Sequence, residues 1–126
     1  MLNNNCSYIS VRKLDYYVNN PNSIIIDLRE KEDYRKAHIK NAVNIPYNEM
    51  KNKIKELKQK NAWFYRKNRF MQIEDKTYND SYIYVFYCER GATSTSVCMQ
   101  MSGLGFISKS VIGGFNNYNG KFVVTG

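Results

Sequence analysis

The hydrophobic positions of the chain alternate between short continuous runs and helical spacings, which is typical of an α/β fold. The continuous runs are Ile24–Ile26 and Tyr82–Tyr87, and their lack of alternation predicts strands that are buried on both faces. Val97, Met101 and Leu104 instead follow each other at i, i+4 and i+7. This spacing predicts a helix from about Thr93 to Met101 with one apolar face.

Weaker patterns predict the remaining elements. We expect further strands at 7–9, 42–45 and 108–112, helices at 11–18, 30–36 and 48–59, and a last short helix or turn after Gly113-Gly114. The stretch 60–80 contains aromatic residues without a clean period, so it is interpreted as an insertion or an irregular excursion.

The length and composition favour one folded domain that spans residues 1–126. The chain has 126 residues, of which 43% are hydrophobic and 14% aromatic, enough for a buried core. No apolar stretch approaches the roughly 18–20 residues of a membrane span. The first ten residues lack the basic and then apolar layout of a signal peptide. We therefore predict a cytoplasmic protein with no membrane partner.

The net charge of +8 is concentrated in one segment. Residues 51–69 hold eight basic residues and one acid, Glu56. One interpretation is a solvated helix face followed by an exposed loop. The other is a surface for an anionic partner, such as RNA, a phosphorylated substrate or an acidic protein. The segment carries no recognisable nucleic-acid motif, which disfavours a nucleic-acid partner.

The three cysteines give no sign of a disulfide framework or a metal site. Cys6, Cys88 and Cys98 are odd in number and have no repeated spacing, and the chain has a single histidine. We expect no metal and no cofactor. Cys98 is interpreted as a small buried hydrophobe, with a resolving thiol as the alternative, and Cys6 receives no role.

Cys88 lies where chemistry is expected in an α/β sheet. It follows a buried strand and precedes a short glycine-containing loop and a helix, so its sulfur lies outside the carboxyl end of that strand. Amides of the loop and of the first helical turn stabilise negative charge there, which favours the reactive thiolate. Gly91 permits the tight loop, and the hydroxyls of Thr93 and Ser94 can add hydrogen bonds. The alternative is a small core residue at a strand end.

Three ordered blocks of sequence resemble the single-domain rhodanese family of sulfurtransferases. The first, IIIDLREKEDYRKAHIKNAVNIPY at 24–47, is similar to the family's Asp-x-Arg strand end and its Gly-His-Ile…Asn-Ile-Pro segment. The second, FYCERGATS at 86–94, is similar to its Cys-x-x-Gly loop. The third, GLGFISKSVIGGFNNYNG at 103–120, is similar to its closing glycine-rich run. The resemblance covers most of the chain apart from a basic insertion or excursion at about 51–80.

The resemblance implies a rhodanese-like three-layer fold, with a central, mostly parallel sheet flanked by helices. It also implies that Cys88 accepts a sulfane sulfur from an anionic donor such as thiosulfate and passes it, as a persulfide, to a thiol or protein acceptor. The expected substrate-binding residues belong to the loop and to the neighbouring strand end: Glu89, Arg90, Gly91, Ala92, Thr93, Ser94 and Arg29. Arg29 has an equal alternative, a structural salt bridge with Asp27 or Glu30. No cofactor is implied.

Departures from the family pattern leave two other functions open. Glu89 directly follows the cysteine and partly offsets Arg90, which places the natural donor in doubt. A non-catalytic adaptor or persulfide carrier is the main alternative. A cysteine phosphatase is disfavoured because Ser94 stands where that class has its phosphate-binding arginine. His38, the one histidine, is interpreted as structural.

Overall fold

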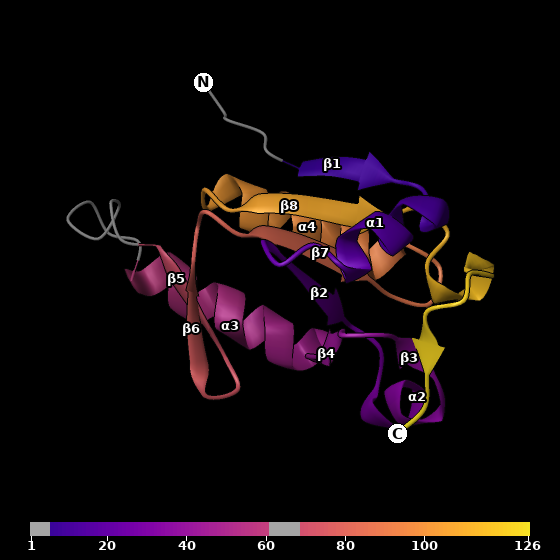
Figure 1. Cartoon of the computed structure of the whole chain (residues 1–126). Coiled ribbons are helices and arrows are strands. Elements are labelled where there is room, and N and C mark those ends of the chain that lie inside the picture. The colour runs from indigo at the N-terminus through magenta and orange to yellow at the C-terminus, as the bar shows by residue number, and fades with distance from the viewer. Residues whose placement is uncertain (1–5, 61–68) are drawn as a thin grey trace.

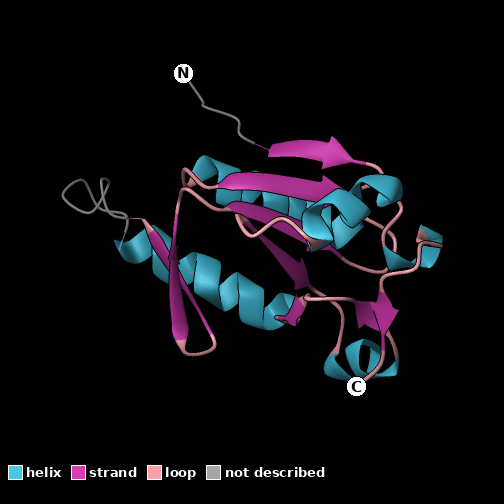
Figure 2. Cartoon of the chain, in the orientation of Figure 1, coloured by secondary structure: helices cyan, strands magenta, loops and turns pink. Residues whose placement is uncertain are grey.

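The computed structural model describes residues 6–60 and 69–126 and contains a central sheet with helices on both faces (Figures 1 and 2). Its five strands are all parallel and follow the order β1-β8-β7-β2-β4. They are β1 (Cys6–Ile9), β2 (Ser23–Asp27), β4 (Val43–Asn44), β7 (Ile83–Tyr87) and β8 (Ile107–Val111). The prediction of an α/β fold with a mostly parallel sheet is therefore confirmed.

Helices pack on the two faces of this sheet and divide the core in two. On one face, α3 (Tyr47–Lys60) and α4 (Ala92–Gly103) cover alternate residues of β2 and β7, among them Ile26 and Phe86. On the other face, the 3-10 helix η1 (Val11–Lys13), α1 (Leu14–Val18) and α2 (Lys31–Lys36) lie beside the intervening residues. Both faces of β2 and β7 are thus buried, as their unbroken hydrophobic runs predict.

The segment 70–79, predicted to be irregular, is a β-hairpin, so that prediction was wrong. Strands β5 (Phe70–Ile73) and β6 (Lys76–Asn79) pair antiparallel, and Glu74 in the turn between them has a left-handed φ of 57°. Met71 and Ile73 alternate with exposed neighbours, and both belong to the same buried cluster as residues of α3 and α4. An alternation over only four residues is too short to be recognised in sequence. Residues 61–68 of the predicted excursion lie outside the described residues.

The carboxyl-terminal part of the chain after β8 forms two short elements. Strand β3 (His38–Ile39) pairs antiparallel with β9 (Val123–Val124), and the 3-10 helix η3 (Phe115–Asn117) follows β8. The pairing of two-residue strands depends on distant partners, and the sequence pattern does not predict it. None of the helices in the described parts of the chain combines the length and hydrophobicity that crossing a bilayer requires.

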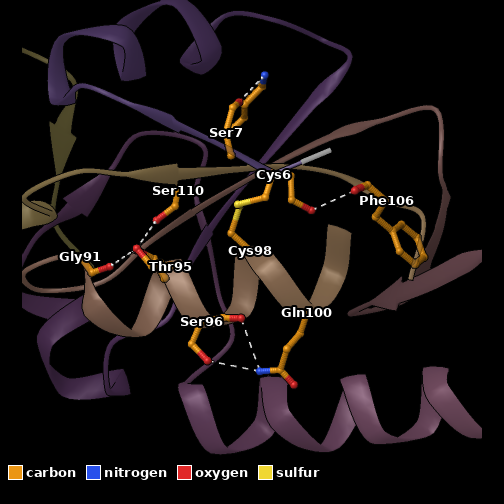
Figure 3. The surroundings of a disulfide bond; sticks show 12 residues. Cys6, Ser7, Gly91, Thr95, Ser96, Cys98, Gln100, Phe106 and Ser110 are labelled. Atoms are coloured by element: carbon orange, nitrogen blue, oxygen red, sulfur yellow. Dashed lines mark hydrogen bonds between the residues drawn. A yellow bond between two sulfur atoms is a disulfide. The ribbon is translucent and has the colours of Figure 1, made fainter. Parts of the chain in front are cut away.

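Cys98 is fully buried, as expected from the sequence, but it forms a disulfide with Cys6, which the number and spacing of the cysteines do not predict (Figure 3). The bond joins β1, at the edge of the sheet, to α4, with a Cα–Cα distance of 5.7 Å and a sequence separation of 92. Cys88 is the free cysteine. Disulfides are typical of oxidising compartments, which weighs against the cytoplasmic location expected from the sequence. That location stays a prediction.

Replacing Cys6 with serine is expected to lower the free energy of unfolding by about 2–4 kcal/mol, because the disulfide closes a long loop in the unfolded chain. Denaturant unfolding of the wild type with and without a reductant measures the same loss independently. The reductant should leave the midpoint of the Cys6→Ser variant unchanged. A wild-type midpoint that does not respond to reduction would contradict the expectation.

Candidate active site

Cys88 lies between β7 and α4, and the backbone curls around its sulfur. The N–H of Gly91 donates to Cys88 Sγ over 3.1 Å, and the N–H of Ser94 donates over 3.4 Å. Only 6% of Cys88 is exposed, so these amides act where water does not compete strongly. Two converging N–H groups stabilise negative charge on sulfur, both on a thiolate and on a persulfide.

Glycine is required at position 91 for two reasons. Its φ of 109° lies in the left-handed region, and a Cβ there would approach Gly113 N to 3.2 Å. Its carbonyl accepts hydrogen bonds from the hydroxyls of Ser94 and Thr95, at 3.1 and 2.8 Å. The Ser94 hydroxyl also contacts Ser110 Oγ at 2.9 Å. The backbone amide of Ser94 therefore donates to the sulfur, and the Ser94 hydroxyl stabilises the loop through its hydrogen bonds.

A second segment supports the loop from the other side. The N–H of Phe115 donates to Cys88 O over 2.8 Å, and the N–H of Asn116 donates to Glu89 O over 3.1 Å. Gly114 precedes them with a φ of 66°, and a Cβ there would lie 2.5 Å from both carbonyl oxygens. Gly114 therefore belongs to the site, a role that its sequence context alone does not reveal.

Arg29 is part of a buried ion pair with Asp27. Its Nε lies 3.1 Å from Asp27 Oδ1 and its Nη2 lies 2.8 Å from Oδ2, while Nη2 also donates to Ala37 O over 2.6 Å. Asp27 is fully buried and Arg29 is 8% exposed. Burial lowers the pKa of Arg29, but the hydrogen bond and charge of Asp27 outweigh burial and raise it. Of the two roles predicted for Arg29, the salt bridge with Asp27 is the one observed.

Arg29 also contacts Glu89, the residue that follows Cys88 in the loop. Its Nη1 lies 3.8 Å from Glu89 Oε1, and its guanidinium lies 4.1 Å from the centroid of the Phe115 ring. Glu89 thus faces Arg29, whereas its adjacency to Arg90 in the sequence predicts that it partly offsets the charge of Arg90. Arg90 and Ala92 are exposed, and Thr93 is half-buried. Arg90 is therefore the loop residue whose cationic side chain is free to meet an anion from solvent.

A hydrogen bond and a ring-stacking contact with Tyr34 fix the orientation of the His38 side chain. Its Nδ1 lies 2.8 Å from Tyr34 O, and its ring stacks on the Tyr34 ring with centroids 3.7 Å apart. These contacts favour the structural role expected from the sequence. Within residues 6–60 and 69–126, no cluster of three or more histidine, cysteine or acidic side chains could hold a metal ion.

Comparison with known proteins identifies the family. The model of the Rhodanese-like domain matches residues 10–121, and the chain therefore belongs to the rhodanese-like family. No curated protein matches the chain.

Solved structures share the fold at low sequence identity. A rhodanese-like domain protein from Staphylococcus aureus is 18% identical, with a TM-score of 0.68 over 95% of this chain and 98% of that one. A rhodanese-related protein from Thermoplasma volcanium is 22% identical, with a TM-score of 0.68 over 94% and 98%. A Saccharomyces cerevisiae homologue of single-domain rhodanese and the Cdc25 phosphatase catalytic domain is 16% identical, with a TM-score of 0.56 over 90% and 80%.

Replacing Gly114 with alanine is expected to destabilise the protein by about 1–3 kcal/mol and to disturb the Cys88 loop, since the new Cβ would overlap two loop carbonyls. Gly103→Ala is the matched control, because a Cβ at Gly103 meets nothing within 4 Å. Denaturant unfolding gives the stability, and the rate of Cys88 alkylation by iodoacetamide reports on the loop. Equal behaviour of the two variants would contradict this account of Gly114.

We expect Tyr87 to make the stability of the protein fall at alkaline pH. Its hydroxyl donates to Asp27 Oδ2 over 2.7 Å, and burial, followed by the charge of Asp27, raises its pKa above the ordinary value. The unfolded chain therefore loses this proton first. The stabilisation is complete below pH ~10 and is lost as the pH rises above that value.

The Tyr87→Phe variant should accordingly lose about 1.5–3 kcal/mol at neutral pH, and its stability should decline less steeply above pH ~10 than that of the wild type. Unfolding curves from pH 7 to about 11 measure both effects. Tyr16→Phe removes an exposed tyrosine and should retain the wild-type slope. If Tyr87→Phe retained that slope as well, the assigned role of Tyr87 would be wrong.

Proposed function

We propose that the protein is a sulfurtransferase that carries a sulfane sulfur on Cys88. The observation that carries the proposal is the pair of amides, from Gly91 and Ser94, that point at Cys88 Sγ. Membership of the rhodanese-like family supports the same chemistry. The proposed donor is a small anion of the thiosulfate type, and the proposed acceptor is a thiol or a protein.

Two displacements at sulfur complete the cycle. In the first, the Cys88 thiolate attacks the outer sulfur of thiosulfate, the S–S bond of thiosulfate breaks, and sulfite leaves with the bonding electron pair. In the second, an acceptor thiolate attacks the outer sulfur of the Cys88 persulfide, and Cys88 leaves as a thiolate. The product is a persulfide on the acceptor. Each step balances in charge and electrons, so the cycle requires no redox cofactor.

The site residues have separate roles in this cycle. The amides of Gly91 and Ser94 hold the negative charge that moves between the Cys88 sulfur and its added sulfur. Arg90, exposed on the Cys88 loop, attracts the anionic donor. Glu89 is drawn toward Arg29, so its charge opposes Arg90 less than their adjacency in sequence implies.

The geometry favours sulfur transfer over phosphate chemistry. Position 94 provides a buried serine whose hydroxyl is bonded within the protein, and not an arginine that could clamp a phosphoryl group. The persulfide-carrier alternative uses the same cysteine and differs only in turnover. Sustained thiocyanate production from thiosulfate and cyanide would assign an enzyme, whereas a single stoichiometric transfer would assign a carrier.

Incubation with thiosulfate should add the mass of one sulfur atom to the intact protein, and the Cys88→Ser variant should show neither the adduct nor transfer to cyanide. Steady-state double-reciprocal plots should be parallel, as expected for two displacements with a covalent intermediate. The matched control is Cys6→Ser, which should retain the adduct because Cys6 lies in the disulfide. Full sulfur transfer by Cys88→Ser would refute the proposal.

A further inference from the structure

Helix α3 presents a row of lysines on one flank, the lysine stripe, composed of Lys51, Lys55 and Lys58. Their spacing of i, i+4 and i+7 places them on one side of the helix. Met50, Ile54 and Leu57 have the same spacing and pack into the core. The stripe is therefore a fixed feature, because the buried residues determine which way the helix faces.

The three lysines are exposed, and no ion pair involves them within residues 6–60 and 69–126. Lys53 differs, since its Nζ donates to Gln72 O in the hairpin over 3.0 Å. Lys51 Nζ lies 5.0 Å from the centroid of the Tyr47 ring, a contact that leaves its charge uncompensated. Like charges on one helix flank destabilise it slightly, so the stripe does not serve folding.

The stripe begins at the same end of the sheet as the Cys88 loop. Leu28 connects the two, since its N–H donates to Tyr87 O over 2.9 Å and its carbonyl accepts from Tyr47 N over 3.1 Å. Tyr47 is the first residue of α3, and Tyr87 immediately precedes Cys88. Helix α4 starts at the same loop and packs against α3 (Figure 3). It carries no charged residue, so nothing on it neutralises the stripe.

We propose that the lysine stripe docks an acidic protein that carries the acceptor thiol. This inference rests on the proposed sulfur transfer and specifies its acceptor. Lys51 and Lys58 are separated by about 10 Å along the helix, farther than a small anion such as thiosulfate can span. A protein surface with several carboxylates matches that length and lies flat on an exposed helix flank. A nucleic-acid groove would place basic residues on both sides of the strand, whereas the neighbouring helix α4 carries no charged residue.

Docking on this flank brings the partner to the end of the sheet that carries the persulfide. The acceptor thiolate then attacks the outer sulfur of the Cys88 persulfide, the S–S bond breaks, and the Cys88 thiolate leaves. Exposed charges of this kind act mainly on the rate of encounter, and salt screens them. The expected signature is therefore a salt-sensitive rate of transfer.

The test uses synthetic peptides, each with a single cysteine, in a glutamate-rich, a neutral glutamine-rich and a lysine-rich form. The protein is loaded with thiosulfate, the persulfide is verified by intact mass, and the rate of sulfur transfer to each peptide is measured. We expect transfer to the acidic peptide to be about fivefold to tenfold faster than to the neutral peptide at low ionic strength. The preference should largely disappear at about 0.5 M salt.

A pair of triple variants distinguishes an effect of the lysine stripe from an effect of the net charge of the protein. Lys51→Gln with Lys55→Gln and Lys58→Gln should abolish the preference for the acidic peptide and leave thiosulfate–cyanide turnover unchanged. The control neutralises three lysines elsewhere that are also exposed: Lys31, Lys36 and Lys40. It removes the same charge and should retain the preference. Equal loss in both variants would show an effect of net charge alone and would overturn the proposal.

Two further outcomes are decisive. If thiosulfate does not load the protein, the proposed function fails, and binding of a fluorescent acidic peptide with serine in place of cysteine still tests the docking surface. That binding should weaken in the Lys51/Lys55/Lys58 variant and persist in the control variant. If a short single-stranded RNA displaces this peptide at lower concentration than polyglutamate of equal charge, the stripe binds nucleic acid and the proposal is overturned.

Discussion

The buried ion pair between Asp27 and Arg29 holds together the end of the sheet on which the site is built. Asp27 also accepts the backbone N–H of Arg29 and the hydroxyl of Tyr87, so both of its carboxylate oxygens are hydrogen-bonded within the protein. Arg29 extends the network to Ala37 O and toward Glu89. The contacts of this buried ion pair therefore link the ends of β2 and β7 to the Cys88 loop. Losing either partner would leave the other unpaired in the core, which is far more costly than losing a surface pair.

Much of the fold follows from the sequence because its strongest signals are local. The unbroken runs of β2 and β7 predict strands buried on both faces, and the strand–loop–helix order around Cys88 predicts where the sulfur lies. The parts that the sequence does not reveal depend on distant neighbours. Cys6 meets Cys98 only because β1 pairs with β8 beside α4, and Gly114 matters only because two loop carbonyls approach it. Arg29 lies between these cases, since the sequence offers Asp27 and Glu30 as possible partners and only the structure selects Asp27.

The basic character of the chain and the anion chemistry of the proposed site have separate structural origins. At Cys88 the positive potential comes from the amides of Gly91 and Ser94, which are neutral groups fixed in direction by the fold. On α3 it comes from lysine side chains in water, which are mobile and screened by salt. The first kind of field acts over a few ångströms on a reacting atom. The second acts over the dimensions of a partner surface, so the two can change independently.

The position of β1 has a consequence for the order in which the chain can assemble. Among the strands in the described parts of the chain, β1 comes first in the sequence, yet its one neighbour in the sheet is β8, with Cys6 opposite Ser108. During synthesis, β1 must therefore wait until β8 has been made before it finds its place. Cys6 and Cys98 both precede β8, so they can be oxidised before the strand that belongs between β1 and β7 exists. Correct assembly thus favours a thiol pair that stays reduced until β8 has been made.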